Sequence, residues 1–287
     1  MRYKHLWKVG VINGEIMQVN PYSLGYKCVG NIGINTSAEN EEEAKKLLEI
    51  KEKPGFRSPP LAFWGKYNIG LLIVTKNIEE WAKELSRLDS NPYIKLVDPL
   101  LWINPTERDH PENLEINLLK QEKTIQQSPS ADSKEQVEID EIDRQIAKIL
   151  TYSSRTSFRK IAKQLNISTK NVIQRYKNLR KNVLTDSTIT LDLKKLGYSA
   201  LMKIFLKSER NKMTEISNKI IQMPNMIVVC KLIGSYDLSA MAALEDLNSL
   251  ISLEKEICAI KGIEQVDISV TELFPSWPGN IFAQLLE

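Results

Sequence analysis

The chain has few of the residues that build metal and disulfide sites. Its 287 residues include two histidines, and its three cysteines, Cys28, Cys230 and Cys258, form no Cys-x-x-Cys pair. This scarcity argues against a metal site and a disulfide framework, and it favours a reducing, cytoplasmic setting. The sequence also has no phosphate-binding loop, Ser/His/Asp set or paired-carboxylate pattern. We therefore expect no metal, no cofactor and no enzyme activity.

Long apolar runs are absent too. No run of 18 apolar residues occurs, and the N-terminus does not have the pattern of a secretory signal. A membrane-spanning helix needs roughly 20 mostly apolar residues, so we expect no membrane partner.

Acidic residues are missing from one stretch. Residues 151–185 contain nine Lys or Arg and no Asp or Glu, whereas the 13 residues at 132–144 hold six acids. The whole chain has a formal net charge of only +3, so its positive charge is concentrated locally. A basic surface on a nearly neutral protein indicates a polyanionic partner, most simply double-stranded DNA.

Three short helices are predicted around this basic stretch. The first runs from about Asp140 to Thr151, with Asp140 as its N-cap. The second opens after Ser157 and ends at Asn166, a residue type that tolerates the left-handed backbone of a tight turn. Ser168 then caps the third. Apolar residues recur at helical spacing in all three, so we expect them to pack together as a helix-turn-helix.

The outward side of the third helix suits the major groove of DNA. Its first turn offers hydroxyl, amide and amine groups, which can reach base edges, and a capped helix start can hold a phosphate. Arg175 and Lys177 lie further along and are expected on backbone phosphates. The expected DNA contacts are Ser157, Arg159, Ser168, Thr169, Lys170, Asn171, Gln174, Arg175 and Lys177.

A wing is predicted after the third helix. Asn182 to Thr190 is expected to form its two short strands, Val183-Leu184 and Ser187–Thr190, with Asp186 near the bend. The alternative for the whole stretch is a solvated, charged helix pair in an ordinary helical domain.

Several short motifs of this chain resemble one protein family when their order and spacing are taken together. The winged-helix motifs are Asp140-x-x-Asp143-Arg144-x-Ile146, Ser157-x-Arg159-x-Ile161-Ala162 and Leu165-Asn166-Ile167-Ser168-x-x-x-Val172-x-x-Arg175. They resemble the leucine-responsive/AsnC (Lrp/AsnC) transcription regulators, in which Gly usually stands at the position of Asn166. Downstream, Leu196-Gly197-Tyr198 and Gly234-Ser235-Tyr236-Asp237 resemble that family's regulatory domain, called RAM. The resemblance covers about residues 138–273.

The pattern of residues 199–273 independently predicts a ferredoxin-like domain. Four apolar runs and two helical patterns alternate in the order β-α-β-β-α-β. Several strands are apolar on both faces, so a sheet-to-sheet dimer or pseudo-dimer is expected. The predicted strands are Ala200–Leu206, Ile227–Ile233, Leu238–Leu244 and Val266–Leu273, and the helices are Met213–Gln222 and Glu245–Ile257.

The first hundred residues repeat the second half of the chain. Arg2–Leu6 matches Arg175–Leu179, Val11-Ile12 matches Val183-Leu184, Leu24–Lys27 matches Leu196–Ser199, and Gly65–Asn68 matches Gly234–Asp237. Glu41–Ile50 after Asn40, Ile78–Leu88 and Leu96–Ile103 fall where two helices and a last strand belong. The predicted fold class is therefore α+β, a winged helix-turn-helix with two ferredoxin-like (βαββαβ) regulatory domains.

The repeat predicts the domain plan. Residues 1–104 form a remnant wing with the first RAM-like domain, 105–137 a linker with an apolar patch at 114–119, 138–190 the winged helix, 191–274 the second RAM-like domain, and 275–287 a tail that packs on the body or on a partner. The repeat starts in the middle of a motif. Either the sequence begins at an internal Met, or a first DNA-binding domain was lost. We favour the first, because Arg2–Leu6 has no evident use without helices that bury it.

The family resemblance implies a DNA-binding transcription regulator that forms homo-oligomers. Two chains are needed to present two recognition helices to a two-fold DNA site. It also implies an amino-acid effector near Gly234, Ser235, Tyr236 and Asp237, where Asp237 meets an ammonium group. The alternative, a plain hairpin turn whose Tyr packs under the sheet, stays open. Asn68 replaces the acid in the first half.

Two other functions are considered. Siroheme decarboxylases resemble the same two-domain plan and are expected to use His and Arg residues of the regulatory domain, but this chain has no His between 111 and 287. A chain with one DNA-binding domain and two regulatory domains also suits an assembly partner that does not itself bind DNA.

Overall fold

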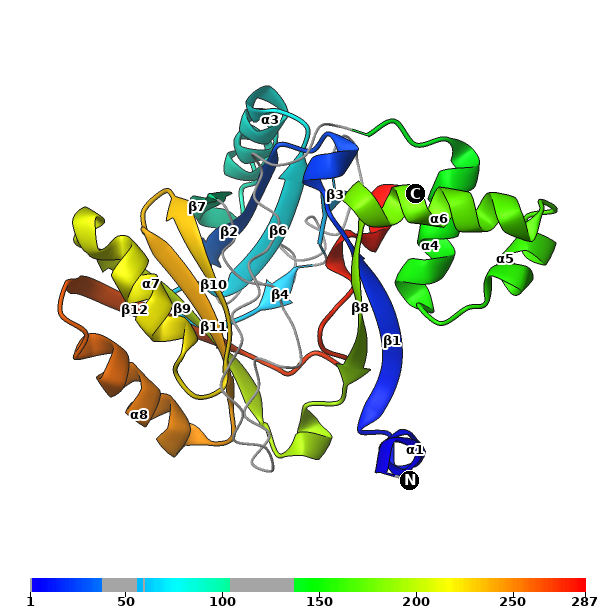
Figure 1. The fold of residues 1–287 in the computed structure, drawn as a ribbon. Helices are drawn as coiled ribbons and strands as arrows, with labels where there is room; N and C mark the ends of the chain where they lie inside the picture. The colour runs from blue at the N-terminus through cyan, green and yellow to red at the C-terminus, as the bar shows by residue number, and fades with distance from the viewer. Residues whose placement is uncertain (1, 38–55, 59, 104–136) are drawn as a thin grey trace. The chain divides into compact units, whose positions relative to one another are not determined.

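The computed structural model describes residues 2–37, 56–58, 60–103 and 137–287. The expected helix Glu41–Ile50 and the linker up to residue 136, with its apolar patch, lie outside these residues. The chain divides into two compact units, each assembled from separate stretches. Unit 1 contains residues 1–27, 131–195 and 274–287, and unit 2 contains residues 28–130 and 196–273. The elements are labelled in Figure 1.

Unit 1 contains the three predicted helices, α4 (Glu141–Tyr152), α5 (Phe158–Gln164) and α6 (Thr169–Asn182). Each begins where its cap was predicted. The side chain of Asp140 accepts a hydrogen bond from the Asp143 N–H, and the Asp143 carboxylate accepts one from the Asp140 N–H, which forms a capping box.

The turn between α5 and α6 has the predicted left-handed residue. Asn166 has φ 54°, and the Ile167 N–H donates to the Ala162 carbonyl at 3.0 Å. This turn lets α5 and α6 share one apolar core with α4. Ile146, Ile161 and Val172 are fully buried in it. Burial of each such side chain contributes about 1.5–3 kcal/mol to stability.

The predicted wing hairpin is wrong. Residues Leu184–Leu191 form one continuous strand, β8, which pairs antiparallel with β1 (Ile12–Val19) from the first half of the chain. The physical reason is local. The stretch contains three Thr and one Ile and has no Gly or Pro for a tight turn, so it stays extended and pairs with a distant strand instead.

The β1–β8 ladder has a local two-fold axis. Ile16 pairs with Thr188, and these residues are 172 positions apart. The repeat places Leu24 opposite Leu196 at the same separation. Ile16 therefore pairs with its own counterpart in the repeat. Helix α1 (Arg2–Lys8) precedes β1 just as α6 precedes β8.

The C-terminal tail packs on unit 1, so its contact is with its own chain. A 3-10 helix, η7 (Ile281–Leu286), buries Leu286 in the same apolar cluster as α4. The Asn280 side chain donates to the Thr151 carbonyl. Further back, Trp277 is fully buried and forms a bridge with Leu191, with backbone N–O distances of 2.7 and 2.9 Å.

In unit 2, the second half of the chain has the predicted β-α-β-β-α-β order. The sheet order is β10-β11-β9-β12, and both helices share one core with it (Figure 1). The elements are β9 (Ala200–Ser208), α7 (Met213–Ile221), β10 (Met226–Ile233), β11 (Leu238–Leu244), α8 (Leu247–Cys258) and β12 (Ile263–Thr271).

The first half supplies the other strands of this sheet. Its main strands lie in the order β6-β2-β7, and Asn77 caps α3. The elements are β2 (Cys28–Thr36), β6 (Ile69–Thr75), α3 (Ile78–Asp89) and β7 (Ile94–Ile103), with the short strands β3 (Phe56–Arg57), β4 (Leu61–Ala62) and β5 (Trp64–Gly65). The predicted helix at 78–88 and last strand at 96–103 are confirmed.

The described strands of the two halves join into one ten-stranded sheet. Strand β7 pairs with β10, where Trp102 is opposite Leu232, and β5 pairs with β12, where Gly65 is opposite Ser269. Side chains from both halves form a shared core that contains Tyr67, Phe205 and Tyr236, among others. Each half thus covers apolar surface of the other within a single chain.

Candidate nucleic-acid interface

Helix α6 presents a polar side to solvent. Thr169, Lys170, Asn171, Gln174 and Lys177 are exposed, whereas Val172 and Leu179 are buried. This division is the one that the helical spacing predicted. The exposed residues of the first turns offer donors and acceptors of the kind that read base edges.

The helix starts carry the two predicted serine caps. The Ser168 hydroxyl oxygen accepts from the Asn171 N–H at 3.1 Å, and the Ser157 hydroxyl oxygen accepts from the Lys160 N–H at 3.3 Å. Both serines are exposed, as is Arg159 on α5. Since a hydroxyl can also donate, each capping serine can bind a phosphate oxygen while it caps its helix. Neither helix has an acid in its first turn.

Arg175 differs from its predicted role on a DNA phosphate. Its Nη1 lies 2.7 Å from an Asp140 carboxylate oxygen and 2.8 Å from one of Asp143, and its Nε donates to Asn171 Oδ1 at 2.8 Å. The hydrogen bonds to Asp143 and Asp140 raise the pKa of Arg175. The guanidinium therefore links α6 to the start of α4, and we assign it a positioning role.

Two other arginines of the basic stretch are also used within the fold. Arg155 Nε lies 2.8 Å from a Glu15 carboxylate oxygen, and its guanidinium carbon lies 5.2 Å from the centroid of the Tyr3 ring. Arg180 donates to the backbone carbonyls of Leu184 and Thr185. Charge counting treats every cation of the stretch as part of the surface and cannot separate these arginines from it.

Seven cations of the stretch are exposed, namely Arg155, Arg159, Lys160, Lys163, Lys170, Lys177 and Lys181. The sequence analysis did not select Lys160, Lys163 or Lys181 as a DNA contact. Lys160, Lys163 and Lys181 could have been found from the absence of acids around them. Exposure in the structure adds these three to the candidates for phosphate contact.

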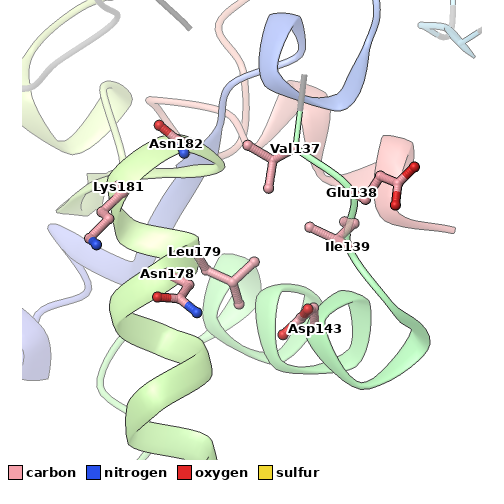
Figure 2. A pocket seen from close by; sticks show the side chains of 8 residues that line it. All are labelled: Val137, Glu138, Ile139, Asp143, Asn178, Leu179, Lys181 and Asn182. Atoms are coloured by element: carbon pink, nitrogen blue, oxygen red, sulfur yellow. The ribbon is translucent and has the colours of Figure 1, made fainter. Parts of the chain in front are cut away.

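A pocket of about 290 Å³ lies between the last turns of α6 and the start of α4 (Figure 2). Figure 2 shows Asn178, Lys181 and Asn182 on α6 on one side, and the 137–139 segment with Asp143 on the other. None of the predicted DNA contacts lines it. The pocket therefore lies away from the polar first turns of α6.

The predicted effector turn, Gly234 to Asp237, is tightly built. A Cβ atom on Gly234, whose φ is 152°, would lie 2.4 Å from the Pro99 carbonyl oxygen. The Asp237 carboxylate accepts from the Ser208 N–H at 2.8 Å. Ser235 is exposed, and its hydroxyl lies 2.7 and 2.6 Å from the two Asp98 carboxylate oxygens.

The two tyrosines of the repeat occupy equivalent places. The Tyr236 hydroxyl donates to Asp267 at 2.8 Å, and the Tyr67 hydroxyl donates to Asp98. Both rings are buried, and burial raises the pKa of each hydroxyl. Tyr236 thus packs between the two halves, as the hairpin alternative predicts. The contact of Asp237 with an ammonium group stays a prediction.

Asn68 takes the place of Asp237 in the first half and makes an equivalent bond. Its side-chain oxygen accepts from the Thr36 N–H at 3.1 Å. An acid or an amide can serve here, because both offer an oxygen acceptor to a strand N–H. The replacement of Asp by Asn therefore does not by itself distinguish a ligand site from a turn.

The described residues bring together no group of three His, Cys, Asp or Glu that could hold a metal ion. No helix among them is long and apolar enough to cross a bilayer.

Comparison with known proteins agrees with this geometry. The AsnC-type helix-turn-helix domain matches residues 139–180. An uncharacterized HTH-type transcriptional regulator of Pyrococcus furiosus is 30% identical over 135 residues, which cover 47% of this chain and 91% of that relative. The HTH-type transcriptional regulator FL11 of Pyrococcus abyssi is 30% identical over 129 residues, 45% of this chain and 85% of that protein.

A solved structure resembles both halves together. The siroheme decarboxylase NirDL superposes with a TM-score of 0.66 at 13% sequence identity, covering 99% of this chain and 85% of that one. At this identity the likeness shows the fold alone.

Proposed function

The chain belongs to the leucine-responsive/AsnC family of transcription regulators, and on that premise we propose that it binds specific double-stranded DNA through α6. The observation that carries this proposal is the exposed, acid-free polar side of α6 beside its serine-capped start. Anions are favoured at such a helix start, and its side chains are of the types that read a major groove.

The exposed residues divide into two kinds of contact. We assign base edges to Thr169, Lys170, Asn171 and Gln174, which lie on the first turns of α6. We assign phosphates to Ser157, Arg159, Ser168 and Lys177. Phosphate contacts fix the register of the protein on the duplex, whereas base contacts determine sequence preference.

The described residues contain one complete recognition helix, α6. Across the local two-fold axis of the β1–β8 ladder, the counterpart of α6 is the short helix α1, which begins at the counterpart of Arg175. A two-fold DNA site takes two recognition helices, so we propose a homodimer or larger homo-oligomer on half-sites about 34–36 Å apart.

Gel-shift assays of the purified chain on its own upstream genomic DNA, across a salt series, test this function. The intact mass of the same sample is recorded. Specific binding that falls steeply with salt supports it, since counterion release accompanies each phosphate contact. Weak binding that does not discriminate between sequences contradicts it and favours an assembly partner that does not read DNA.

We also propose that an amino acid acts at the 234–237 turn. In support, Ser235 is exposed and its hydroxyl lies 2.7 and 2.6 Å from the two Asp98 carboxylate oxygens, to which an ammonium group can also donate. Thermal-shift measurements with each of the common amino acids test this role. If none raises the melting temperature of the wild-type chain, the turn serves packing alone.

The fold shared with a siroheme decarboxylase leaves a second candidate to be tested. His5 and His110 are the only histidines of this chain, so the half that carries the second regulatory domain has none. We therefore propose a regulator and not an enzyme. A haem-like absorption band on addition of a tetrapyrrole would reverse that choice.

A further inference from the structure

Two turns of unit 2 have the same arrangement, one turn from each half of the chain. Each contains a glycine with positive φ, Gly65 at 129° and Gly234 at 152°, that packs against a strand of the other half. A Cβ atom on Gly65 would collide with the Ile268 carbonyl oxygen, and one on Gly234 with the Pro99 carbonyl oxygen. The repeat therefore builds two equivalent sites at which a turn meets a strand.

Each site contains one aspartate, at the fifth residue of the strand. Asp98 lies on β7 and Asp267 on β12. The Tyr67 hydroxyl donates to Asp98, and the Tyr236 hydroxyl donates to Asp267, with 31 positions between the members of each pair. The Gln265 side chain also donates to Asp267. A carboxylate has about four acceptor positions, so each aspartate can accept from a further donor that the turn of the other half supplies.

The residue after each glycine makes the two sites different. At Asp267 this residue is Lys66, whose Nζ lies 4.0 Å from a carboxylate oxygen and 5.8 Å from the centroid of the Tyr236 ring. At Asp98 it is Ser235, whose hydroxyl lies 2.7 and 2.6 Å from the two carboxylate oxygens. One aspartate thus faces a cation, whereas the other faces a neutral hydroxyl.

Lys66 is an ammonium group at neutral pH. The Tyr236 hydroxyl raises its pKa most, followed by the carboxylates of Asp267 and then Asp98. An ion pair at 4.0 Å gains little by charge alone, but an ammonium group over an aromatic ring gains a second attraction. The side chain is therefore held at the Asp267 site by two partners.

Asp98 has no such cation. Among the residues that the structure describes, its side-chain partners are the hydroxyls of Tyr67 and Ser235, and no lysine or arginine forms an ion pair with it. Both partners are neutral, so the carboxylate keeps its negative charge. It is also partly exposed, so a group from solvent can reach it. An ammonium group suits it, because charge-assisted hydrogen bonds are about twice as strong as neutral ones.

We propose that Lys66 acts as a built-in ammonium ligand for Asp267 and leaves Asp98 as the one site of the pair for an external ligand. That ligand is a primary amine, whose ammonium group takes at Asp98 the place that Lys66 takes at Asp267. One chain thus binds one amine, although the repeat provides two turns. This inference rests on the proposed ligand role of the 234–237 turn and narrows it to one site per chain.

The first test measures melting of unit 2 in the full chain by calorimetry, with about 100 mM n-propylammonium chloride as the probe. Tetramethylammonium chloride at the same concentration has no N–H donor and controls for ionic strength. The probe should raise the melting temperature of the wild type by roughly 1–3 °C more than the control salt does. Asp98→Asn should abolish this rise, because the amide keeps an oxygen acceptor for Tyr67 but loses the charge.

The second test asks whether Lys66 blocks the Asp267 site. In the Asp98→Asn background, Lys66→Ala should restore a rise of similar size, because the probe then reaches Asp267. Lys76→Ala in the same background is the matched control. Lys76 is an exposed lysine of the same half that forms no ion pair among the described residues, so its loss should restore nothing.

A third variant fills the Asp98 site from within the chain. Ser235 is exposed, so a longer side chain fits at this position. Ser235→Lys should give Asp98 a built-in ammonium group like that at Asp267. It should raise the melting temperature in the absence of the probe and abolish the response to the probe.

Three outcomes overturn the proposal. The first is a wild type that does not respond to n-propylammonium beyond the control salt. The second is a Lys66→Ala, Asp98→Asn double variant that does not respond, which would make the Lys66 contact an ordinary surface ion pair. The third is a response that survives Ser235→Lys, which would place the amine elsewhere. The amino-acid role fails separately: if the probe acts through Asp98 but none of the common amino acids does, the amine site stands without it.

Discussion

The guanidinium of Arg175 lies 2.8 Å from the carboxylate of Asp143, which joins the middle of α6 to the first turn of α4. Both side chains are largely shielded from solvent, with 24% and 19% of their surfaces exposed. Asp140, the N-cap of α4, also contacts the Arg175 guanidinium. These contacts hold α6, the proposed recognition helix, against the start of α4.

Replacing Arg175 should therefore act on the fold. Arg175→Ala should lower the free energy of unfolding of unit 1 by roughly 1–3 kcal/mol, the range for hydrogen bonds to charged groups. DNA affinity should fall, but the slope of binding against salt should keep its value, because no phosphate contact is lost. Denaturant unfolding and a salt series check the two parts. A slope reduced by about one unit would return Arg175 to the phosphate contacts.

Lys177 and Gln174 should behave differently from each other. Lys177→Ala should weaken binding to all sequences alike and reduce the salt slope by about one unit, as expected for one lost phosphate contact. Gln174→Ala should instead change the preferred bases at one position and leave the slope unchanged. Competition assays on randomised sites, repeated at several salt concentrations, distinguish the two. If both variants behave alike, α6 does not lie in the major groove as proposed.

The Asp140 carboxyl should make unit 1 sensitive to acid. The hydrogen bond from the Asp143 N–H, and then the bond with Arg175, lower the pKa of Asp140. A carboxyl whose pKa is lower in the folded chain stabilises it above the unfolded pKa of about 3.9, and this contribution is lost as the pH falls through the lowered folded value. The melting temperature of Asp140→Asn should lie below that of the wild type at pH 7, and the gap should shrink below about pH 4.

Asp192→Asn serves as a control for the effect of Asp140→Asn on the melting temperature. Asp192 is partly exposed and pairs with Lys195 at 3.9 Å, near the limit for an ion pair. Asp192→Asn should produce a smaller gap at pH 7. Equal gaps for the two variants would show that the cap and the arginine contribute nothing special at Asp140.

The C-terminal helix η7 should contribute to the stability of unit 1. Leu286 is 3% exposed in the cluster that contains α4, so Leu286→Ala should cost about 2–5 kcal/mol, the range for a buried Leu. Ile281, on the same short helix, is 37% exposed, and Ile281→Ala should cost no more than about 0.5 kcal/mol. Equal effects in denaturant unfolding would mean that the tail does not pack on α4 in solution.

The sequence predicted the helix-turn-helix well because its signals are local. Asp140, Ser157 and Ser168 each cap the helix that follows, and Asn166 takes the left-handed turn. A capping side chain bonds to backbone only three residues away, so the information is contained in the segment itself. The apolar runs of the second half likewise predict its strands, although the last strand is Ile263–Thr271 and not Val266–Leu273.

The errors concern partners that are distant along the chain. Nothing near β8 indicates that its partner is β1, more than 160 residues earlier, so a local wing was expected. The inward position of Arg175 likewise depends on where Asp143 lies after folding. Only the internal repeat carried long-range information. The apolar faces predicted a sheet-to-sheet contact, whereas the structure also joins the two halves at their edges, through β7–β10 and β5–β12.

Gly234 offers a last test, at the contact between those halves. A methyl group there would meet the Pro99 carbonyl oxygen at 2.4 Å, in a backbone conformation with φ 152° that favours glycine. Gly197 has φ 96°, but a Cβ atom there would meet nothing within 4 Å. Both substitutions by Ala incur backbone strain of roughly 1–3 kcal/mol, and only Gly234→Ala adds a clash with a fixed backbone atom. Gly234→Ala should therefore lower the melting temperature of unit 2, measured by calorimetry, clearly more than Gly197→Ala. If the two variants melt together, β7 and the 234–237 turn do not approach each other as closely as the structure places them.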